Sequence, residues 1–98
     1  MAVFAIIYTY AENSSEARDR HRPAHREYLN ELAERDVNLC SGPFGPDEAP
    51  GGLLIVRADS AEEAVAYTDD DPFRTEGLVS DVSVREWVPV IGKLAKEI

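Results

Sequence analysis

The chain has 98 residues, a length that corresponds to one domain spanning residues 1–98. Hydrophobic residues make up 44% of it and charged residues 30%, so neither a disordered polar chain nor a membrane protein is expected. Ten Lys and Arg residues stand against nineteen Asp and Glu, which gives a net charge of −9. This acidity argues against binding to nucleic acid or to an anionic membrane, because both need a basic surface.

The content of cysteine and glycine limits the cofactors that the chain can hold. Cys40 is the single cysteine, which excludes an intramolecular disulfide and most zinc sites. A reducing, cytoplasmic compartment is the simplest interpretation. The glycine-rich segment 42–52 lacks the GxGxxG and GxxxxGK[ST] patterns of nucleotide-binding loops. The sequence therefore predicts neither a cofactor nor a metal ion.

Four segments are rich in β-branched and aromatic residues or alternate between apolar and polar residues, and we predict them as strands: residues 3–10, 37–42, 53–58 and 82–88. Three prolines and four glycines in residues 42–52 predict a loop between the second and third strands. Residues 90–98 follow the last strand and form either a frayed helix or an arm that binds a partner.

In the segments between these strands, apolar residues recur at the spacing of a helix. Ser15 to Arg35 carries such a stripe, but Pro23 interrupts it by removing a backbone donor. We predict a short turn from Ser15 and a main helix from near Pro23, with a single kinked helix as the alternative. A second helix runs from Asp59 to about Tyr67, and a short third one from Pro72 to Glu76.

The resulting element order is β-α-β-β-α-β, which predicts an α+β, ferredoxin-like fold. This fold has a four-stranded antiparallel sheet with helices on one face. Residues 3–8 and 53–56 are almost continuously apolar, so the other face of the sheet is also expected to be buried. A second subunit is the natural cover in a chain this small. We therefore expect a homodimer.

The chain's two histidines, His21 and His25, lie one helical turn apart. His25 begins the apolar stripe, so its ring should point toward the sheet, where an imidazole can act as general acid or base. The alternative for His25 is a half-buried ring bonded to a backbone carbonyl. A metal site on the pair is disfavoured by the surrounding arginines.

Asp71 is the carboxylate that best fits a partnership with His25. Pro72 biases Asp71 toward an extended backbone, which suits the N-cap of the short helix that follows. A carboxylate has two oxygens, so Asp71 can cap this helix with one and meet His25 with the other.

The arginines of the first helix form a local positive patch on an acidic chain. Arg18 and Arg22 are four residues apart on one side, where they can hold an anionic substrate near His25. Arg20 and Arg26 are expected to pair with acidic residues on a solvated face. The flexible segment 42–52 suits a lid over a small pocket.

Several motifs along nearly the whole chain resemble the YciI-like (YCII-related) family: Arg18-x-x-x-Arg22-Pro23-Ala24-His25, Ser41-Gly42-Pro43, Asp71-Pro72-Phe73-x-x-x-Gly77 and Val82-Ser83-Val84-Arg85. The resemblance implies a ferredoxin-like fold and dimers whose sheets pack face to face. It also implies an active site with a His and an Asp in one pocket, which here are His25 and Asp71. The resemblance makes Arg22 and the Gly42-Pro43 loop walls of this pocket, and the full set of residues that we expect to bind substrate is Arg18, Arg22, Ser41, Gly42, Pro43 and Phe73.

Together, the residues and the resemblance predict a small cofactor-independent enzyme of the lyase or isomerase type. His25 would move a proton on a small, cyclic, anionic organic substrate, while Asp71 fixes the tautomer of the ring and stabilises the imidazolium. The main alternative is a non-catalytic dimeric module that binds a small ligand. A third possibility is a monooxygenase of the same fold group that acts without a cofactor.

Overall fold

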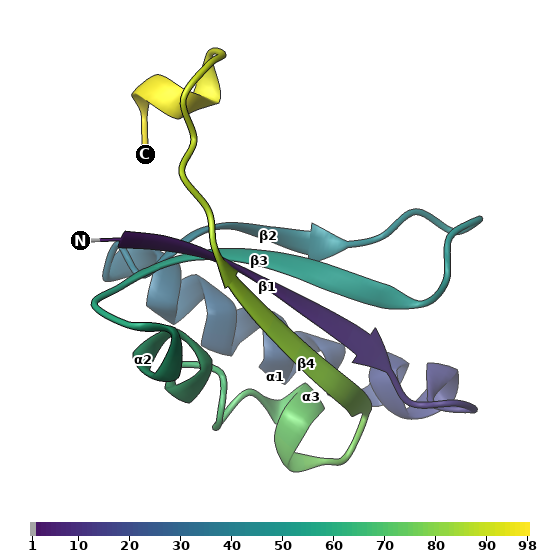
Figure 1. Ribbon diagram of the computed structural model, residues 1–98. Helices are drawn as coiled ribbons and strands as arrows, with labels where there is room; N and C mark the ends of the chain where they lie inside the picture. The colour runs from purple at the N-terminus through teal and green to yellow at the C-terminus, as the bar shows by residue number, and fades with distance from the viewer. Residues whose placement is uncertain (1) are drawn as a thin grey trace.

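The computed structural model describes residues 2–98. Its elements are β1 (Ala2–Tyr10), α1 (Ser15–Glu34), β2 (Asn38–Pro43), β3 (Gly51–Ala58), α2 (Ala61–Ala66), α3 (Pro72–Thr75), β4 (Val79–Glu86) and a 3-10 turn (Leu94–Lys96). All three α-helices lie on one face of a single sheet (Figure 1). This arrangement confirms the predicted ferredoxin-like α+β fold, with α3 as a short addition between α2 and β4.

The sheet has the order β2-β3-β1-β4, and every neighbouring pair of strands is antiparallel. Because side chains alternate along a strand, β1 turns every second residue toward the helices. Phe4, Ile6 and Tyr8 are these residues, and all three are buried. Tyr8 is thereby placed beneath α1 and α3, near the end of β1.

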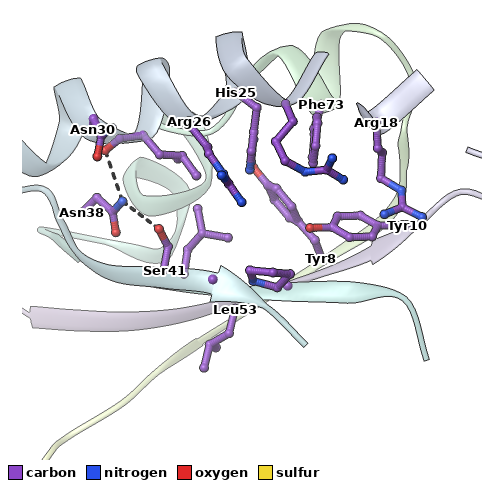
Figure 2. Close-up of a pocket in the computed structure, with 16 residues that line it drawn as sticks. Tyr8, Tyr10, Arg18, His25, Arg26, Asn30, Asn38, Ser41, Leu53 and Phe73 are labelled. Carbon is purple, nitrogen blue, oxygen red and sulfur yellow. Dashed lines mark hydrogen bonds between the residues drawn. The ribbon is translucent and has the colours of Figure 1, made fainter. Parts of the chain in front are cut away.

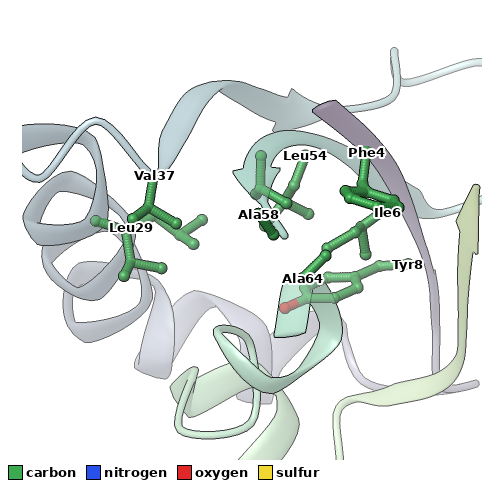
Figure 3. Packing of buried hydrophobic residues seen from close by; sticks show 10 residues of the cluster. Phe4, Ile6, Tyr8, Leu29, Val37, Leu54, Ala58 and Ala64 are labelled. Atoms are coloured by element: carbon green, nitrogen blue, oxygen red, sulfur yellow. The ribbon is translucent and has the colours of Figure 1, made fainter. Parts of the chain in front are cut away.

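The core lies between the sheet and the helices (Figure 3). The buried residues that form this core are Phe4, Ile6, Tyr8, Leu29, Leu32, Val37, Leu54, Val56, Ala58 and Ala64. Complete burial of one Leu, Ile, Val or Phe side chain contributes about 1.5–3 kcal/mol. This packing fixes the position of α1 over the sheet.

The first helix is one continuous element, so the predicted split near Pro23 is wrong. Pro23 lies inside α1 and is exposed to solvent. An interior proline destabilises a helix by about 3 kcal/mol. After the proline, Leu29 and Leu32 pack into the core. Before the proline, the Arg18 N–H donates to the Ser14 carbonyl oxygen at 2.8 Å. Contacts on both sides thus outweigh the local effect of the proline.

The loop predicted at residues 42–52 is shorter than expected, because the paired strands extend into it. β2 continues to Pro43, and β3 begins already at Gly51. A Cβ atom on Gly51 would lie 2.3 Å from the Tyr8 carbonyl oxygen, so only glycine permits this close pairing with β1. The last strand likewise begins earlier than predicted, at Val79.

Beyond β4, residues 87–98 leave the sheet on the side opposite the helices (Figure 1). A single 3-10 turn forms near the C-terminus. Of the helices that the structure describes, none has the length and apolar character needed to cross a membrane.

Candidate active site

His25 and Asp71, 46 residues apart in sequence, lie in direct contact. His25 projects from α1, and Asp71 is the N-cap of α3. The Nδ1 atom of His25 lies 2.7 Å from Oδ1 of Asp71. The Asp71 side chain is fully buried, whereas 13% of the His25 side chain remains exposed. The histidine can therefore meet a ligand directly, and the aspartate acts on that ligand only through it.

The two oxygens of Asp71 are used differently from the sequence-based expectation. Oδ1 serves both purposes, because it accepts the Phe73 N–H at 3.0 Å and also contacts His25. Oδ2 accepts a hydrogen bond from the Tyr8 hydroxyl at 2.8 Å. The predicted division, with one oxygen for the cap and one for His25, is wrong because Tyr8 occupies the second oxygen.

Tyr8 is the site residue that sequence reasoning missed. Its side chain is buried on a central strand of the sheet, and burial together with the nearby Asp71 charge raises the pKa of Tyr8. The phenol therefore stays protonated and acts as a donor. The available signal was an aromatic side chain with a polar tip at an inward-facing strand position, since a buried Tyr hydroxyl needs a partner.

These contacts determine the tautomer of His25. An ionised carboxylate only accepts hydrogen bonds, and that of Asp71 accepts from Tyr8 and from the Phe73 backbone. The contact between Asp71 and His25 is a hydrogen bond only when Nδ1 of His25 carries the proton. Nε2 then keeps its lone pair, and it forms no hydrogen bond within residues 2–98. In this tautomer Nε2 of His25 can accept a hydrogen bond from a ligand.

The plane of the His25 ring is fixed by Phe73. The two rings stack with centroids 3.8 Å apart and planes inclined by 4°. Tyr10 contacts the same Phe73 ring edge-on, with centroids 5.7 Å apart. One face of the imidazole is therefore covered by Phe73. The hydrogen bond to Asp71 keeps the imidazole ring from turning within its own plane.

His25 lines a cavity of about 320 Å³, a size suited to a small organic molecule (Figure 2). It lies between α1 and the ends of β1, β2 and β3. All six residues expected to contact substrate lie on its wall: Arg18, Arg22, Ser41, Gly42, Pro43 and Phe73. Asp71 is not part of the wall and lies behind His25.

Three arginines of α1 line the cavity, at intervals of four residues: Arg18, Arg22 and Arg26. The guanidinium of Arg18 lies 4.4 Å from the centroid of the Tyr10 ring. Arg22 pairs with Asp19 at 2.6 Å. Arg26 is exposed, as expected, and it also lines the cavity, because the spacing that joins Arg18 to Arg22 continues to it. The cavity thus has a positive rim on an acidic chain, which favours anionic ligands.

Asn38 and Ser41 supply the polar part of the wall on β2 (Figure 2). The Asn38 Nδ2 donates to the Leu29 carbonyl at 3.2 Å and to the Ser41 Oγ at 3.0 Å. Because the Ser41 oxygen acts as acceptor here, its own O–H can donate to a ligand. Asn38 was missed because nothing in the sequence marks the first residue of a strand as part of a site.

The second histidine points elsewhere. His21 Nε2 lies 3.6 Å from the Glu76 carboxylate, so the two histidines have different partners. Across residues 2–98, no three His, Cys, Asp or Glu side chains gather in a manner that could hold a metal ion.

A domain model and a known protein both match most of this chain. The model of the YCII-related domain matches residues 2–88. The uncharacterized protein YjpA of Bacillus subtilis (strain 168) is 33% identical over 85 residues, which cover 83% of this chain and 95% of YjpA.

Solved structures are also similar. The 5-chloro-2-hydroxyhydroquinone dehydrochlorinase of Burkholderia phenoliruptrix AC1100, in complex with 2,5-dihydroxybenzoquinone, has a TM-score of 0.73 and 28% identity, covering 87% of this chain and 92% of that one. An antibiotic biosynthesis monooxygenase has a TM-score of 0.57 at 14% identity, covering 93% of this chain and 100% of that one, and shares the fold alone. By the domain match and the curated relative, the chain belongs to the YCII-related domain family.

Proposed function

We propose that this protein is a small enzyme in which His25 transfers a proton on a small, cyclic, anionic organic substrate, by lyase or isomerase chemistry. The observation that carries the proposal is the 2.7 Å contact between His25 and the buried Asp71, with the histidine open to a cavity. A histidine oriented by a carboxylate is the usual arrangement of a general base.

The base in this proposal is Nε2 of His25. It takes a proton from a carbon or hydroxyl group of the substrate, and the resulting imidazolium is stabilised by Asp71. In a lyase reaction, the electron pair left on the substrate expels an anionic leaving group. In an isomerase reaction, the imidazolium returns the proton to a different substrate atom. General acid–base catalysis of this kind contributes roughly 10²–10⁴-fold to a rate.

The arginines bind and stabilise the substrate in this proposal. Proton removal from a hydroxylated or carbonyl-bearing ring places negative charge on an oxygen atom. Arg18, Arg22 and Arg26 line the cavity, where a guanidinium can donate charge-assisted hydrogen bonds to such an oxygen. The Ser41 hydroxyl offers a further donor on the opposite wall.

The similarity to a dehydrochlorinase supports this class of chemistry. Removal of hydrogen chloride from a ring is a lyase-type elimination, which needs a base and a leaving anion. Its ligand, 2,5-dihydroxybenzoquinone, is a small cyclic acid. Both properties agree with a cavity that joins a histidine base to a positive rim.

An NMR titration of both histidine rings tests the His25–Asp71 pair in solution. His21, with its long contact to the exposed Glu76, serves as the internal control. We expect His25 to show one tautomer, with Nδ1 protonated, and to differ in this from His21. If the ring signals of His25 match those of His21 and do not respond to Asp71→Asn, the pair does not operate in the free protein.

A turnover screen with hydroxylated and chlorinated hydroquinones tests the catalytic role. Chloride release or isomerisation should be lost in His25→Gln and retained in His21→Gln. A ligand such as 2,5-dihydroxybenzoquinone that binds equally well to wild type and His25→Gln, with no turnover by either, would instead identify a non-catalytic binding module. Oxygen consumption during turnover would identify a monooxygenase.

The proposed enzyme is a homodimer in which a second copy covers the helix-free face of the sheet. Ile7 lies on this face and is 38% exposed, although it belongs to a central strand. Ala5 and Leu53, which alternate with the inward residues of β1 and β3, are partly exposed beside it. An apolar face on a central part of a sheet is a typical contact surface.

A further inference from the structure

Arg18 reaches the cavity wall from the beginning of α1, and two uncharged partners hold its side chain in place. Nε of Arg18 donates a hydrogen bond to Oγ of Ser14 at 3.0 Å. The guanidinium lies over the Tyr10 ring, 4.4 Å from its centroid (Figure 2). A guanidinium that is bonded at Nε and covered on one face by an aromatic ring has little freedom to turn. Its orientation is therefore set before any ligand arrives.

Ser14 does not cap the helix that it precedes. A serine at this position usually accepts a hydrogen bond from a backbone N–H of the first turn. The buried hydroxyl of Ser14 makes no such bond. It donates instead to the Ala11 carbonyl at 2.6 Å and accepts from Nε of Arg18. The local structure at the start of α1 thus positions Arg18 in place of capping the helix.

The two terminal nitrogens of Arg18, Nη1 and Nη2, have no partner among residues 2–98, where neither takes part in a hydrogen bond or an ion pair. The chain has nineteen acidic residues, yet none pairs with this partly buried guanidinium. By contrast, Arg22 pairs with Asp19 at 2.6 Å, and Arg26 is exposed to solvent. A charge withdrawn from water is usually paired with an opposite charge. The wall therefore holds a cation whose counter-charge can come from a ligand.

We propose that Arg18 is a carboxylate anchor, so that the anionic group of the ligand is a carboxylate carried by its ring. Because Nε is already engaged, the two terminal nitrogens form a planar fork. The parallel N–H groups of such a fork match the two oxygens of a carboxylate, whereas a single phenolate oxygen does not use both.

The anchor lies at a suitable place relative to His25. Arg18 and His25 are seven residues apart on α1, which corresponds to about 10 Å along the helix axis. Both line the same cavity, and they contact the two members of one aromatic pair, Tyr10 and Phe73. A ring acid held at Arg18 lies with its ring between the anchor and the histidine. The inference rests on the proposed function in taking this ligand to be the substrate of His25.

Two probes of similar shape and different charge test the anchor: benzoate and benzamide. Their dissociation constants for the full chain are measured by NMR titration. We expect the wild type to bind benzoate at least about tenfold more tightly than benzamide. Arg18→Gln should remove this preference. Arg20→Gln is the matched control, since it removes the same charge from an exposed position of α1 outside the cavity wall, and it should keep the preference.

Ser14→Ala separates the position of the guanidinium from its charge. The variant retains Arg18 but frees Nε. Because Ser14 makes no capping hydrogen bond, α1 should stay folded, as checked by circular dichroism. The preference for benzoate should fall about threefold to tenfold, since the side chain must now be ordered on binding. Binding of benzamide should stay the same, and an unchanged preference would overturn the positioning role of Ser14.

The outcomes distinguish the anchor from the proposed function. A wild type that binds the two probes alike, or binds neither at millimolar concentration, overturns the anchor. So does a preference that survives in Arg18→Gln, even where that variant is less stable, because the arginine then has a structural role alone. These results leave proton transfer by His25 to the turnover screen, whose hydroquinones carry no carboxylate. Conversely, His25→Gln should keep the preference for benzoate, so the anchor stands even if no turnover is found.

Discussion

Tyr8 and His25 bind the two oxygens of one buried carboxylate, that of Asp71, at 2.8 Å and 2.7 Å. The first residue comes from the central strand and the second from α1. Because both oxygens are held, the carboxylate cannot rotate away from the histidine. Tyr8 is therefore a positioning residue in the proposed mechanism, in which its hydroxyl acts through Asp71.

Tyr8→Phe tests this positioning role. The change removes a donor and leaves Oδ2 of Asp71 buried without its partner, which should lower the free energy of unfolding by about 1–3 kcal/mol. Turnover should fall with little change in KM, and the NMR signals of the His25 ring should shift. Urea unfolding and histidine NMR measure these effects. Tyr10→Phe is the control, and equal effects of both variants would contradict the proposal.

The raised pKa of Tyr8 predicts how stability depends on pH. In the unfolded chain, a tyrosine loses its proton near pH 10, whereas burial raises the pKa of Tyr8 in the folded state. The folded protein therefore binds more protons than the unfolded chain above about pH 10, and its stability falls as the pH rises. Below that pH the contribution is complete.

Tyr8→Phe should flatten this decline between pH 10 and 11, as followed by urea unfolding at each pH. The decline should not vanish, because burial also raises the pKa of Tyr10 and of Tyr28. An unchanged slope in Tyr8→Phe would show that its hydroxyl titrates alike in the folded and unfolded states.

Asp71→Asn should separate charge from geometry. The Phe73 N–H needs an oxygen acceptor, so we expect the amide oxygen to remain at the Oδ1 position and His25 to keep its tautomer. The negative charge is lost, so the imidazolium that forms in the proposed mechanism becomes less stable. Turnover should fall about 100-fold or more. Nitrogen NMR of the ring checks the tautomer, and a switch to protonated Nε2 would show that the amide has rotated.

Arg26→Gln tests the positive rim of the cavity. Loss of one guanidinium donor should weaken binding of 2,5-dihydroxybenzoquinone by about tenfold, as measured by calorimetry. Arg20→Gln is the matched control, because Arg20 is an exposed arginine of the same helix that does not line the cavity. Equal losses in both variants would mean that only the general charge of α1 matters. Added salt should reduce the difference between them.

The order of the elements was predictable because each strand and helix has a clear hydrophobic period. The split of α1 was wrong because local proline chemistry says nothing of the packing of Leu29 and Leu32. His25 and Asp71 were identified through their motifs. Tyr8 was not, because its contact depends on which face of β1 turns inward and on what lies above it.

Two residues of the cavity wall were also not predicted from the sequence. Arg26 was not assigned to the wall, because helical spacing alone does not decide which face of α1 borders the cavity. Asn38 gains its position from the sharp turn after α1, where Asp36 has a positive φ of 60°. Such contacts join distant segments, and a single sequence does not specify them.

The stacked ring of Phe73 gives the site a handedness. Since the Asp71 hydrogen bond and the stack together hold the imidazole in one orientation, the lone pair of Nε2 has a single direction in the cavity. A planar substrate anchored by the arginines presents one side to it. Proton removal and return would be confined to one prochiral face, and a reaction run in deuterated water would yield a product labelled on that face alone.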